Sequence, residues 1–596
     1  MARYVSVPLL QIGNNDAPDE LMNDIQQISV EESLHLPAMF TLIVYNPYFP
    51  GNDQDKPWRY DDLLTIGQVV KIGFQASTMA DTTFSEEQRA YLIEGEITAI
   101  ESQFTRESEA PVIVRGYDRS HRLHRGRFNR SFQNYTDTDI VKEIANEVGI
   151  EIGQLDASGA PHDYVFQENQ TNMEFLRQRA ARLGFELFVQ DNKLYFRKPT
   201  SNQTLQLTWL EDFGVFKVRV STAEQVSAVE VHGWDYTKKE AIVSTANRED
   251  VLTQTEHGSG SNSSSQFATS TQPPKLIVVD QPIATPNEAD AIAQALYNEL
   301  GGEFVVADAS GTGNPYIRAG RLIQLEDMGK YSGEYYVTET RHLYYQRRYT
   351  TDFCVRGLRG GSLLRDLAPR PSLRPAQTFL VGIVTNNQDP DDLGRVRVRF
   401  PTLTPETDGS AHESNWARVL GLGVGDQRGM QWLPEIDDEV LVGFEHGDIH
   451  RPYVIGGVWN GKDKTPDKVE DAIEKGKVRL RSLKTRTGHL LQFVEEDKDR
   501  SKAGVYLTTA SGHTLALNDS DRAVTLVTQG GHQLRLDDQQ QRVEIRTSGG
   551  HTLLLDDRNR SITLQSNGSI SIRAGTTISI EANGSISLQG ATINLN

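Results

Sequence analysis

Cysteine and long apolar runs are what this 596-residue chain most lacks. The single cysteine, Cys354, excludes a disulfide scaffold and any cysteine-based zinc or iron–sulfur cluster. No run approaches the roughly 18 apolar residues of a membrane helix, and the start, MARYVSVPLLQIGNN, lacks the pattern of a signal peptide. Positive charge is also scarce: 61 Lys and Arg against 81 Asp and Glu give a net charge of -20, which argues against nonspecific nucleic-acid or anionic-lipid binding. We therefore expect an acidic, soluble, multidomain protein that is cytoplasmic on synthesis and has no nucleic-acid partner.

The first part of the chain, residues 1–365, is predicted to mix α and β structure. Runs rich in β-branched and aromatic residues predict strands over Phe40–Tyr45 and Pro111–Arg115. Apolar periodicity predicts a helix over Thr138–Val148, with Asp137 or Thr138 as N-cap. It also predicts a helix over Asn287–Leu300, before Gly301 and Gly302.

Between these two, a helix over Thr171–Leu183 is predicted to begin with a capping box of Thr171 and Glu174 and to end at Gly184. The composition of His257–Ser265, which continues to Pro273 and Pro274, predicts a flexible surface loop.

A proline- and arginine-rich linker, residues 366–378, separates this part from a compact β segment over residues 379–460. Alternating runs predict strands within Gly394–Phe400, Glu439–Phe444 and Tyr453–Val458. Several short strands within about eighty residues are typical of a small closed barrel. A charged connector over residues 461–485 follows.

Residues 486–596 are repetitive, and this is the most informative part of the sequence. The pair Gly-His recurs every 19 residues at His513, His532 and His551, with an earlier copy at His489. Each copy is followed by a strand pattern, a polar turn and a second strand pattern, for example Leu515 and Leu517, then Asn518-Asp519, then Val524 and Leu526. After Gly568 the repeat shortens to eight residues, with Ile570, Ile578 and Ile586 in phase.

The eight-residue repeats alternate Ile or Leu with Ser or Thr, so one face of each short strand is apolar. After Asn567 this segment has no proline and no Phe, Tyr or Trp, and its only charged residues are Arg573 and Glu581. A single chain would leave the apolar stripe and the strand edges uncovered. Three chains wound around one axis would cover both, and we therefore predict an intertwined trimeric β-helix. A single-chain solenoid remains the alternative for the 19-residue section but does not suit the octads.

The recurring polar residues of the repeats allow two interpretations. His513, His532 and His551 share the parity of inward-facing leucines, and three imidazoles on a three-fold axis can bind a metal ion. Recurrence on every coil favours a structural role instead, in which each imidazole bonds the backbone of a turn. The same recurrence makes the paired aspartates of the turns structural, because a glycosidase needs one singular pair. We therefore expect no catalytic residue, no cofactor and no metal.

Several long motifs resemble one family in their order along the chain. Residues 94–100, 115–127, 138–141 and 170–185 resemble the hub of VgrG spike proteins, a module shared with phage baseplate hubs. Residues 389–401 and 445–461 resemble the OB-fold barrel of these spikes, and the Gly-His-Thr-Leu repeats resemble their needle. The resemblance implies a mostly β, multidomain fold: an α+β hub with β-barrel modules, an OB-fold barrel and a trimeric β-helix.

The resemblance also implies a function. The expected role is the homotrimeric central spike of a contractile injection system (phage-tail-like particle, extracellular device or type VI secretion apparatus), which adapts a hexameric inner tube to a three-fold needle that punctures the target envelope. The implied partners are two further copies of the chain, inner-tube and baseplate proteins, a PAAR-like tip protein and effector cargo. The spike would be assembled into the baseplate and delivered or released outside the cell with the particle. Without a lysozyme module after the barrel or an extension after Asn596, the sequence favours a bare spike.

Enzymatic readings find little support in the sequence. The motifs of zinc proteases, serine hydrolases and P-loop nucleotide hydrolases are absent. The basic cluster Arg115–Arg130 is expected to pair with acidic side chains across domains or subunits. The alternative is a trimeric tailspike-like polysaccharide-degrading enzyme. It needs aromatic sugar platforms, whereas Phe493 and Tyr506 are the only Phe, Tyr or Trp from Arg486 onward.

The last turn departs from the pattern of the repeats. The octad phase requires apolar residues at 594 and 596, but the chain has Asn594 and Asn596 there, with Ile593 and Leu595 displaced by one residue. We therefore predict that the tip protein binds Thr592, Ile593, Asn594, Leu595 and Asn596.

Overall fold

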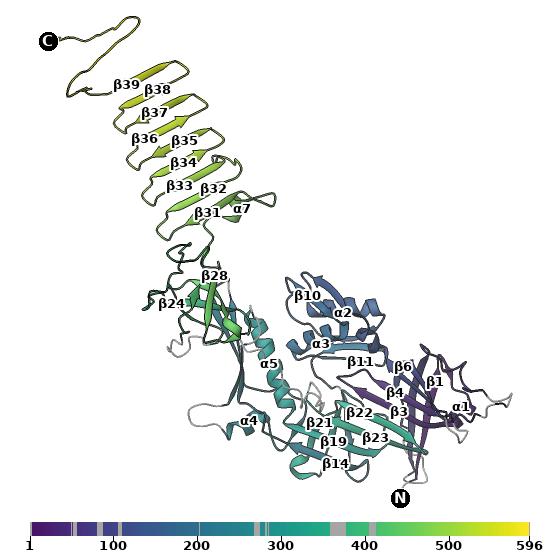
Figure 1. The fold of residues 1–596 in the computed structure, drawn as a ribbon. Coiled ribbons are helices and arrows are strands. Elements are labelled where there is room, and N and C mark those ends of the chain that lie inside the picture. Colours follow the sequence, from purple (N-terminus) through teal and green to yellow (C-terminus); the bar gives the residue numbers. More distant parts are fainter. Residues whose placement is uncertain are drawn as a thin grey trace. The chain divides into compact units, whose positions relative to one another are not determined.

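The computed structural model describes residues 3–48, 51, 56–79, 88–104, 110–201, 203–235, 237–267, 274–279, 283, 285–357, 377–403 and 413–594. The chain is mostly β and forms two compact units, Met1–Gly461 and Lys462–Asn596. Figure 1 shows the hub and barrel sheets of the first unit and the stacked short strands of the second. The expected linker at residues 366–378 lies outside the described residues up to residue 376.

An eleven-stranded antiparallel sheet is the frame of the hub. Its central strands alternate buried and partly exposed residues, as β4 does with Phe40, Leu42 and Val44 fully buried. Neighbouring strands in spatial order are β14 (Phe213–Val220), β19 (Val305–Thr312), β23 (Arg348–Val355), β22 (Glu339–Tyr345), β3 (Ile25–Ser33), β4 (Met39–Val44), β7 (Val112–Asp118), β6 (Gln88–Ser102), β5 (Val69–Met79), β1 (Arg3–Ile12) and β2 (Asn15–Asp16).

An α/β insertion follows β7. It has its own core, in which Ile140, Ile144 and Leu176 of two helices pack on Leu194 and Phe196. Its elements are η1 (Arg119–His124), β8 (Phe128–Phe132), α2 (Asp137–Val148), β9 (Glu151–Leu155), β10 (Val165–Gln170), α3 (Asn172–Leu183), β11 (Glu186–Gln190) and β12 (Lys193–Arg197).

The helix boundaries follow from the caps. Thr171 accepts the Glu174 amide and Gly184 adopts φ +66°, so the predicted capping box and end of α3 are confirmed. For α2 the predicted N-cap is wrong: Thr136, not Asp137 or Thr138, caps the helix in a reciprocal box with Asp139.

The rest of the hub contains two smaller sheets. Helix α5 (Pro286–Gly302) packs on β15 and β16, and Gly301 and Gly302 lie inside this helix rather than after it. One sheet is β13 (Thr204–Leu207), β20 (Leu322–Leu325), β21 (Gly333–Tyr336) and β17 (Gln254–Thr255), and the other is β16 (Glu240–Ala246), β15 (Ala228–Asp235) and β18 (Lys275–Val278). The short helices are α1 (Asp19–Asp24) and η2 (Gly329–Tyr331).

The predicted flexible loop at His257–Ser265 is wrong, because the helix α4 (Gly260–Ser265) forms there. Ser259 caps this helix by accepting the Asn262 amide, and the buried Ser264 hydroxyl donates to the Gln225 carbonyl. The local cap and the tertiary bond to Gln225 together outweigh the low helix propensity of serine and glycine. Residues 268–273 of the predicted loop lie outside the described residues.

The barrel contains five strands in the order β25 (Arg397–Arg399), β24 (Leu380–Asn386), β27 (Glu439–Phe444), β28 (Pro452–Gly457) and β26 (Arg418–Val419), with η4 (Glu445–Gly447) between β27 and β28. Val396 and Ala417 exchange two backbone hydrogen bonds of 3.0 and 2.7 Å beside the two outer strands. This bridge closes the sheet around Val384, Val398 and Val440, as the sequence predicts.

The second unit contains α7 (Val469–Ala472), the hairpin β29 (Ile473–Glu474) and β30 (Lys477–Val478), and a nine-stranded antiparallel meander. We call this meander the needle sheet; it begins at Leu480, within the segment that the sequence assigns to the connector. Its strands are β31 (Leu480–Lys484), β32 (Leu490–Val494), β33 (Gly504–Thr508), β34 (Thr514–Asn518), β35 (Ala523–Val527), β36 (Gln533–Asp537), β37 (Arg542–Arg546), β38 (Thr552–Asp556) and β39 (Ser561–Gln565).

Candidate functional site: one apolar face and two edges of the needle sheet

The needle sheet has one face that is apolar over almost its entire length. Every strand has five residues, so its second and fourth side chains lie on one face. Cross-strand register aligns these positions into two columns. The first is Leu483, Leu491, Leu507, Leu515, Leu526, Leu534, Ile545, Leu553 and Leu564, and the second is Arg481, Phe493, Val505, Leu517, Val524, Leu536, Val543, Leu555 and Ile562.

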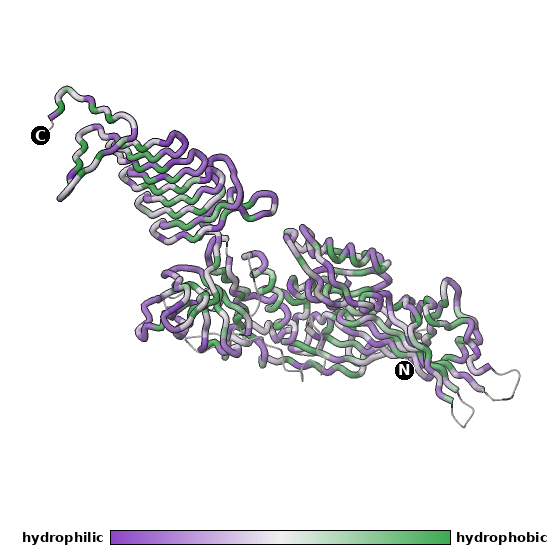
Figure 2. The backbone as a smooth tube through the Cα atoms, turned by 45° about the horizontal axis from the view of Figure 1, so that its top comes forward, coloured by the Kyte–Doolittle hydropathy of each residue, from purple (hydrophilic) through white to green (hydrophobic). Residues whose placement is uncertain are grey.

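No described element of the second unit covers this face. Leu517 is 40% exposed and Leu536 is 41% exposed, although both lie in the middle of the sheet. The last strand is more open, with Ile562 76% exposed. Figure 2 shows hydrophobic and hydrophilic residues alternating along these strands. An apolar face of this length needs a cover to be stable in water.

One edge of the sheet consists of four equivalent turns with the pattern Thr-x-x-Gly-His. In the second, the Thr509 hydroxyl accepts the His513 amide at 3.0 Å, and Gly512 has φ +93°, a conformation that favours glycine. The imidazole Nδ1 of His513 accepts the Gln529 amide of the next turn at 3.2 Å. His513 and His532 thus bond the backbone of the next turn, as the structural interpretation predicts, whereas His551 lies 2.9 Å from the Ser566 hydroxyl.

The opposite edge consists of polar turns in which Asn or Asp caps the backbone. Asp537 Oδ1 accepts the Gln540 amide at 2.9 Å, and Asp556 Oδ1 accepts the Asn559 amide at 2.9 Å. These backbone hydrogen bonds lower the pKa of both carboxyl groups. The recurring aspartates are thus turn residues, in agreement with the prediction.

The residues predicted to bind a tip protein are only partly described. Thr592, Ile593 and Asn594 form no helix or strand, and Ile593 is 50% exposed; Leu595 and Asn596 lie outside the described residues. The described octads, residues 568–594, likewise form no strand within this single chain, and their side chains are exposed. Their winding with other copies stays a prediction.

A polar contact between hub and barrel has no signal in the sequence. The indole of Trp234 donates to Glu439 Oε1 at 3.0 Å, and the Asn460 amide donates to Glu439 Oε2 at 2.9 Å. His232 Nδ1 lies 2.9 Å from the Thr402 carbonyl. Glu439 is 3% exposed, so this contact joins β15 of the hub to β27 of the barrel through buried groups.

The basic cluster over Arg115–Arg130 is neutralised by hub carboxylates. Arg122 bonds Glu96, and Arg130 bonds Glu147 at 2.7 Å. Further pairs are Arg115–Glu101, Arg119–Glu94 and Arg127–Glu174. The cluster therefore pairs with acidic side chains as predicted, but these partners lie within the hub and not in another domain; pairing across subunits stays a prediction.

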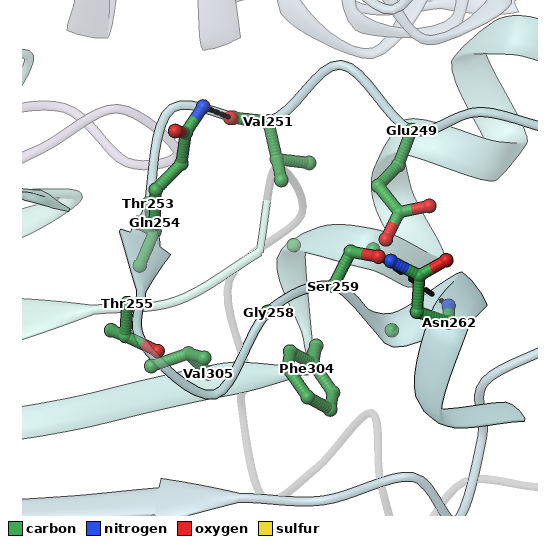
Figure 3. Close-up of a pocket in the computed structure, with 13 residues that line it drawn as sticks. Glu249, Val251, Thr253, Gln254, Thr255, Gly258, Ser259, Asn262, Phe304 and Val305 are labelled. Carbon is green, nitrogen blue, oxygen red and sulfur yellow. Dashed lines mark hydrogen bonds between the residues drawn. The ribbon is translucent and has the colours of Figure 1, made fainter. Parts of the chain in front are cut away.

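A cavity of about 250 Å³ lies in the hub between α4, the end of α5 and residues 249–255 (Figure 3). Glu249 is the one titratable side chain in its lining. The Ser261 amide donates to the Glu249 carboxylate at 3.1 Å. Burial raises the pKa of Glu249, but the hydrogen bonds with Ser261 oppose this effect. The net result is a lowered pKa. This carboxylate binds an amide of the first turn of α4, and an ionised carboxylate is a poor general acid.

Among the described residues, no group of three or more His, Cys, Asp or Glu side chains is placed to hold a metal ion. No helix in the described ranges is long and apolar enough to cross a membrane.

Two family models match separate parts of the chain. Residues 380–459 match the family described as the type VI secretion system/phage-baseplate injector OB domain, and residues 83–346 match the Alg8 N-terminal domain. The chain is 23% identical over 400 residues to the type VI secretion system spike protein VgrG3 of Vibrio cholerae, covering 62% of the chain and 38% of the relative. The resemblance to VgrG-type spike proteins is confirmed.

Other VgrG-type similarities are shorter or more distant. VgrG1a of Pseudomonas aeruginosa is 28% identical over 158 residues, which cover 26% of the chain and 24% of that protein. The chain therefore spans less than two fifths of the length of either curated relative. The solved structure of a type VI secretion component from E. coli aligns over 75% of this chain and 99% of the E. coli chain. The identity is 16% and the TM-score is 0.36.

Proposed function

We propose that the chain is the homotrimeric central spike of a contractile injection system. The apolar face of the needle sheet is the observation that carries this proposal, because side chains of both columns, such as Leu526 (44%) and Leu536 (41%), stay exposed within one chain. Three copies that turn these faces toward a common axis would bury all of them and leave the polar faces in water. A three-fold arrangement also allows the octads of the three chains to pair, which removes their open edges.

In this proposal each part of the chain has a mechanical task. The hub, residues 1–365, adapts a hexameric inner tube to three-fold symmetry and contacts tube and baseplate proteins. The barrel, residues 379–460, and the connector, residues 461–485, gather three chains. The needle, residues 486–596, carries the tip protein, punctures the target envelope and leaves the cell with the particle. The spike performs no enzymatic reaction, and any effector cargo travels with it.

The oligomeric state tests the proposal most directly. Light scattering coupled to size exclusion should give about three times the chain mass of 66.6 kDa. A monodisperse species of 66.6 kDa would contradict the trimer, because a soluble monomer would have to leave the whole apolar face in water.

The tip protein is proposed to bind the last turn, Thr592 to Asn596. Here the one-residue shift of Ile593 and Leu595 interrupts the octad pattern, so three copies of this segment would offer backbone groups with which a β-rich cap can pair. Deleting these five residues should abolish co-purification of the tip protein and leave the mass of the trimer unchanged. A truncated trimer that retains its tip protein would place the binding site elsewhere.

Chemical inertness needs a separate assay. The purified trimer should not cleave peptidoglycan or capsule polysaccharide. Cleavage that disappears when one carboxylate is replaced would favour the polysaccharide-degrading alternative.

A further inference from the structure

The hub cavity of Figure 3 has walls that the hub itself holds in place. Gln225 ties two of them together: its side-chain amide donates to the Leu300 carbonyl at 2.7 Å, and its own carbonyl accepts the Ser264 hydroxyl at 3.1 Å. The Asp250 amide donates to the Asn298 side chain of α5 at 2.8 Å. The cavity of about 250 Å³ is therefore preformed, as binding sites for small ligands usually are.

Two glycines keep space open in these walls. A Cβ atom at Gly301 would lie 2.8 Å from the Cβ atom of Glu249, so the glycine near the end of α5 makes room for the Glu249 side chain. A Cβ atom at Gly258 would meet no atom within 4 Å beyond its chain neighbours. Gly258 has φ +80°, a conformation that itself favours glycine, so no side chain fills the cavity from this turn.

Glu249 brings a negative charge to the cavity. Although burial raises its pKa, hydrogen bonds with Ser261 outweigh this effect, so the group is ionised at neutral pH. Its Oε1 atom accepts the Ser261 amide at 3.1 Å, whereas Oε2 is buried and accepts no hydrogen bond of ordinary length from a described residue. A carboxylate that is only partly satisfied in this way is stabilised by a cation placed beside it.

An anion does not suit the same cavity. The amides of the first turn of α4 are already used, that of Ser261 by Glu249 and that of Asn262 by the Ser259 hydroxyl at 3.4 Å. None of the described residues that line the cavity is Lys, Arg or His. The lining therefore selects positive over negative charge.

The remaining wall is apolar. Val251, Phe304 and Val305 line it, and Phe304 and Val305 are almost fully buried. Figure 3 shows the Glu249 carboxylate pointing toward Ser259, with the Phe304 ring below both. A primary alkylammonium ion matches this division, because it joins a charged head with three donors to an apolar stem.

We propose that the hub cavity binds a primary alkylammonium group, with the ammonium beside the Glu249 carboxylate and the alkyl stem against Val251 and Phe304. The same chemistry occurs in a free alkylamine and in the lysine side chain of another protein. The site lies within one chain, so it depends neither on the trimer nor on the proposed role as a spike.

Titration of the full-length protein with n-butylammonium chloride tests the proposal, in about 0.15 M salt so that weak surface attraction to the acidic chain is screened. The methyl signals of Val251 and Val305 in isotope-labelled protein report binding at the cavity. They should shift with a saturable midpoint on the order of 1–10 mM, the range for so small a ligand. n-Butanol has the same stem without the charge and should bind about tenfold more weakly. No saturable shift with n-butylammonium, or equal affinity for n-butanol, would overturn the proposal.

Two variants locate the site. Glu249→Gln keeps an acceptor for the Ser261 amide but removes the charge, so the affinity for n-butylammonium should fall about tenfold or more. Glu256→Gln removes an exposed carboxylate nearby in the chain and should bind as the wild type does. Val251→Phe narrows the apolar wall, leaves Glu249 in place and should also weaken binding severalfold. Unchanged affinity in Glu249→Gln or in Val251→Phe would show that the ligand binds elsewhere and that the proposal is wrong.

A second probe distinguishes the two sources of the ligand. Nα-acetyl-lysine N-methylamide carries the same ammonium and stem on a peptide backbone. If it displaces n-butylammonium, the cavity admits a lysine side chain of a partner protein; if it does not, the cavity takes free alkylamines. Both results support the alkylammonium site, whereas failure of both probes to shift the Val251 and Val305 signals contradicts it.

Discussion

Strand β4 of the hub and strand β34 of the needle carry the same alternation of apolar residues with opposite results. In β4, Phe40, Leu42 and Val44 are fully buried, because other elements of the same chain cover that face of the sheet. In β34, Leu515 and Leu517 remain 36% and 40% exposed, because no described element of the second unit covers this face of the meander. The same alternation is thus covered within one chain in the hub and is left open within one chain in the needle sheet.

This comparison can be tested separately in the two units. All six tryptophans of the chain, Trp58, Trp209, Trp234, Trp416, Trp432 and Trp459, belong to the first unit. Tryptophan fluorescence therefore follows unfolding of hub and barrel alone, while particle mass follows assembly of the needle.

The largest effect is expected from a charge on the apolar face of the needle. Leu536→Asp places a carboxylate in the second column, where three copies would bury it without a partner, at a cost of several kcal/mol for each copy. Light scattering should show that the variant no longer forms a trimer. The unfolding midpoint measured by tryptophan fluorescence should not change. Thr525→Asp adds the same charge to the opposite face and should stay trimeric. If both variants assemble equally well, the apolar face is not the trimer interface.

The second prediction concerns the ion pair that fastens the insertion to the hub sheet. Arg318 is 4% exposed and bonds Glu32 at 2.6 Å and Asp191 at 2.9 Å. Arg318→Leu leaves Glu32 buried without this partner and should lower the free energy of unfolding by about 3–5 kcal/mol. Arg115→Leu removes the exposed pair with Glu101 and should cost less than about 1 kcal/mol. Equal losses in the two variants would contradict the difference in burial.

A feature of the fold or of the candidate site could be predicted from the sequence where the residues that determine it are close together in the chain. The needle hairpins were predictable, because Leu515, Leu517, Val524 and Leu526 mark both strands of a repeat with period two. The pairing of Trp234 with Glu439 was not, because residues 205 positions apart share no local pattern.

The helix N-caps were predictable only in part. Thr171 was predictable as an N-cap, whereas Thr136 is followed by Asp137 and Thr138, which are equally good cap residues. The helix α4 was missed for the opposite reason, since a tertiary bond to Gln225 overrides its composition.

A third, smaller effect is expected from a buried carboxyl group of the hub. Burial raises the pKa of Glu186 from its ordinary 4.5 to about 7, while the Tyr336 hydroxyl donates to it at 2.7 Å. Between pH 4.5 and 7 the folded chain therefore holds a proton that the unfolded chain has lost. The stability from this group is fully present below pH 4.5 and is lost as the pH rises to 7.

Glu186→Gln keeps an acceptor for Tyr336 and removes the titration. The variant should be more stable than the wild type at pH 8 by on the order of 2 kcal/mol, with no advantage at pH 4. Tryptophan-monitored denaturation at several pH values measures this difference. Glu101→Gln, at an exposed ion pair, serves as control and should follow the wild type throughout. A Glu186→Gln protein that also follows the wild type would show that the carboxyl group does not titrate in this range.

The smallest expected effect concerns a cap that shields one helix end of the hub. The Glu174 amide donates to the Thr171 hydroxyl at 3.1 Å, and the Glu174 carboxylate accepts the Thr171 amide at 3.0 Å. Thr171→Ala removes the first bond and should destabilise the start of α3 by about 1 kcal/mol. Thr171→Ser keeps the hydroxyl and should restore most of that loss. Hydrogen exchange of the Glu174 amide measures both changes locally. Because the needle sheet has no such helix end, its exchange should be the same in the two variants, and a change there would mean that the two units do not fold independently.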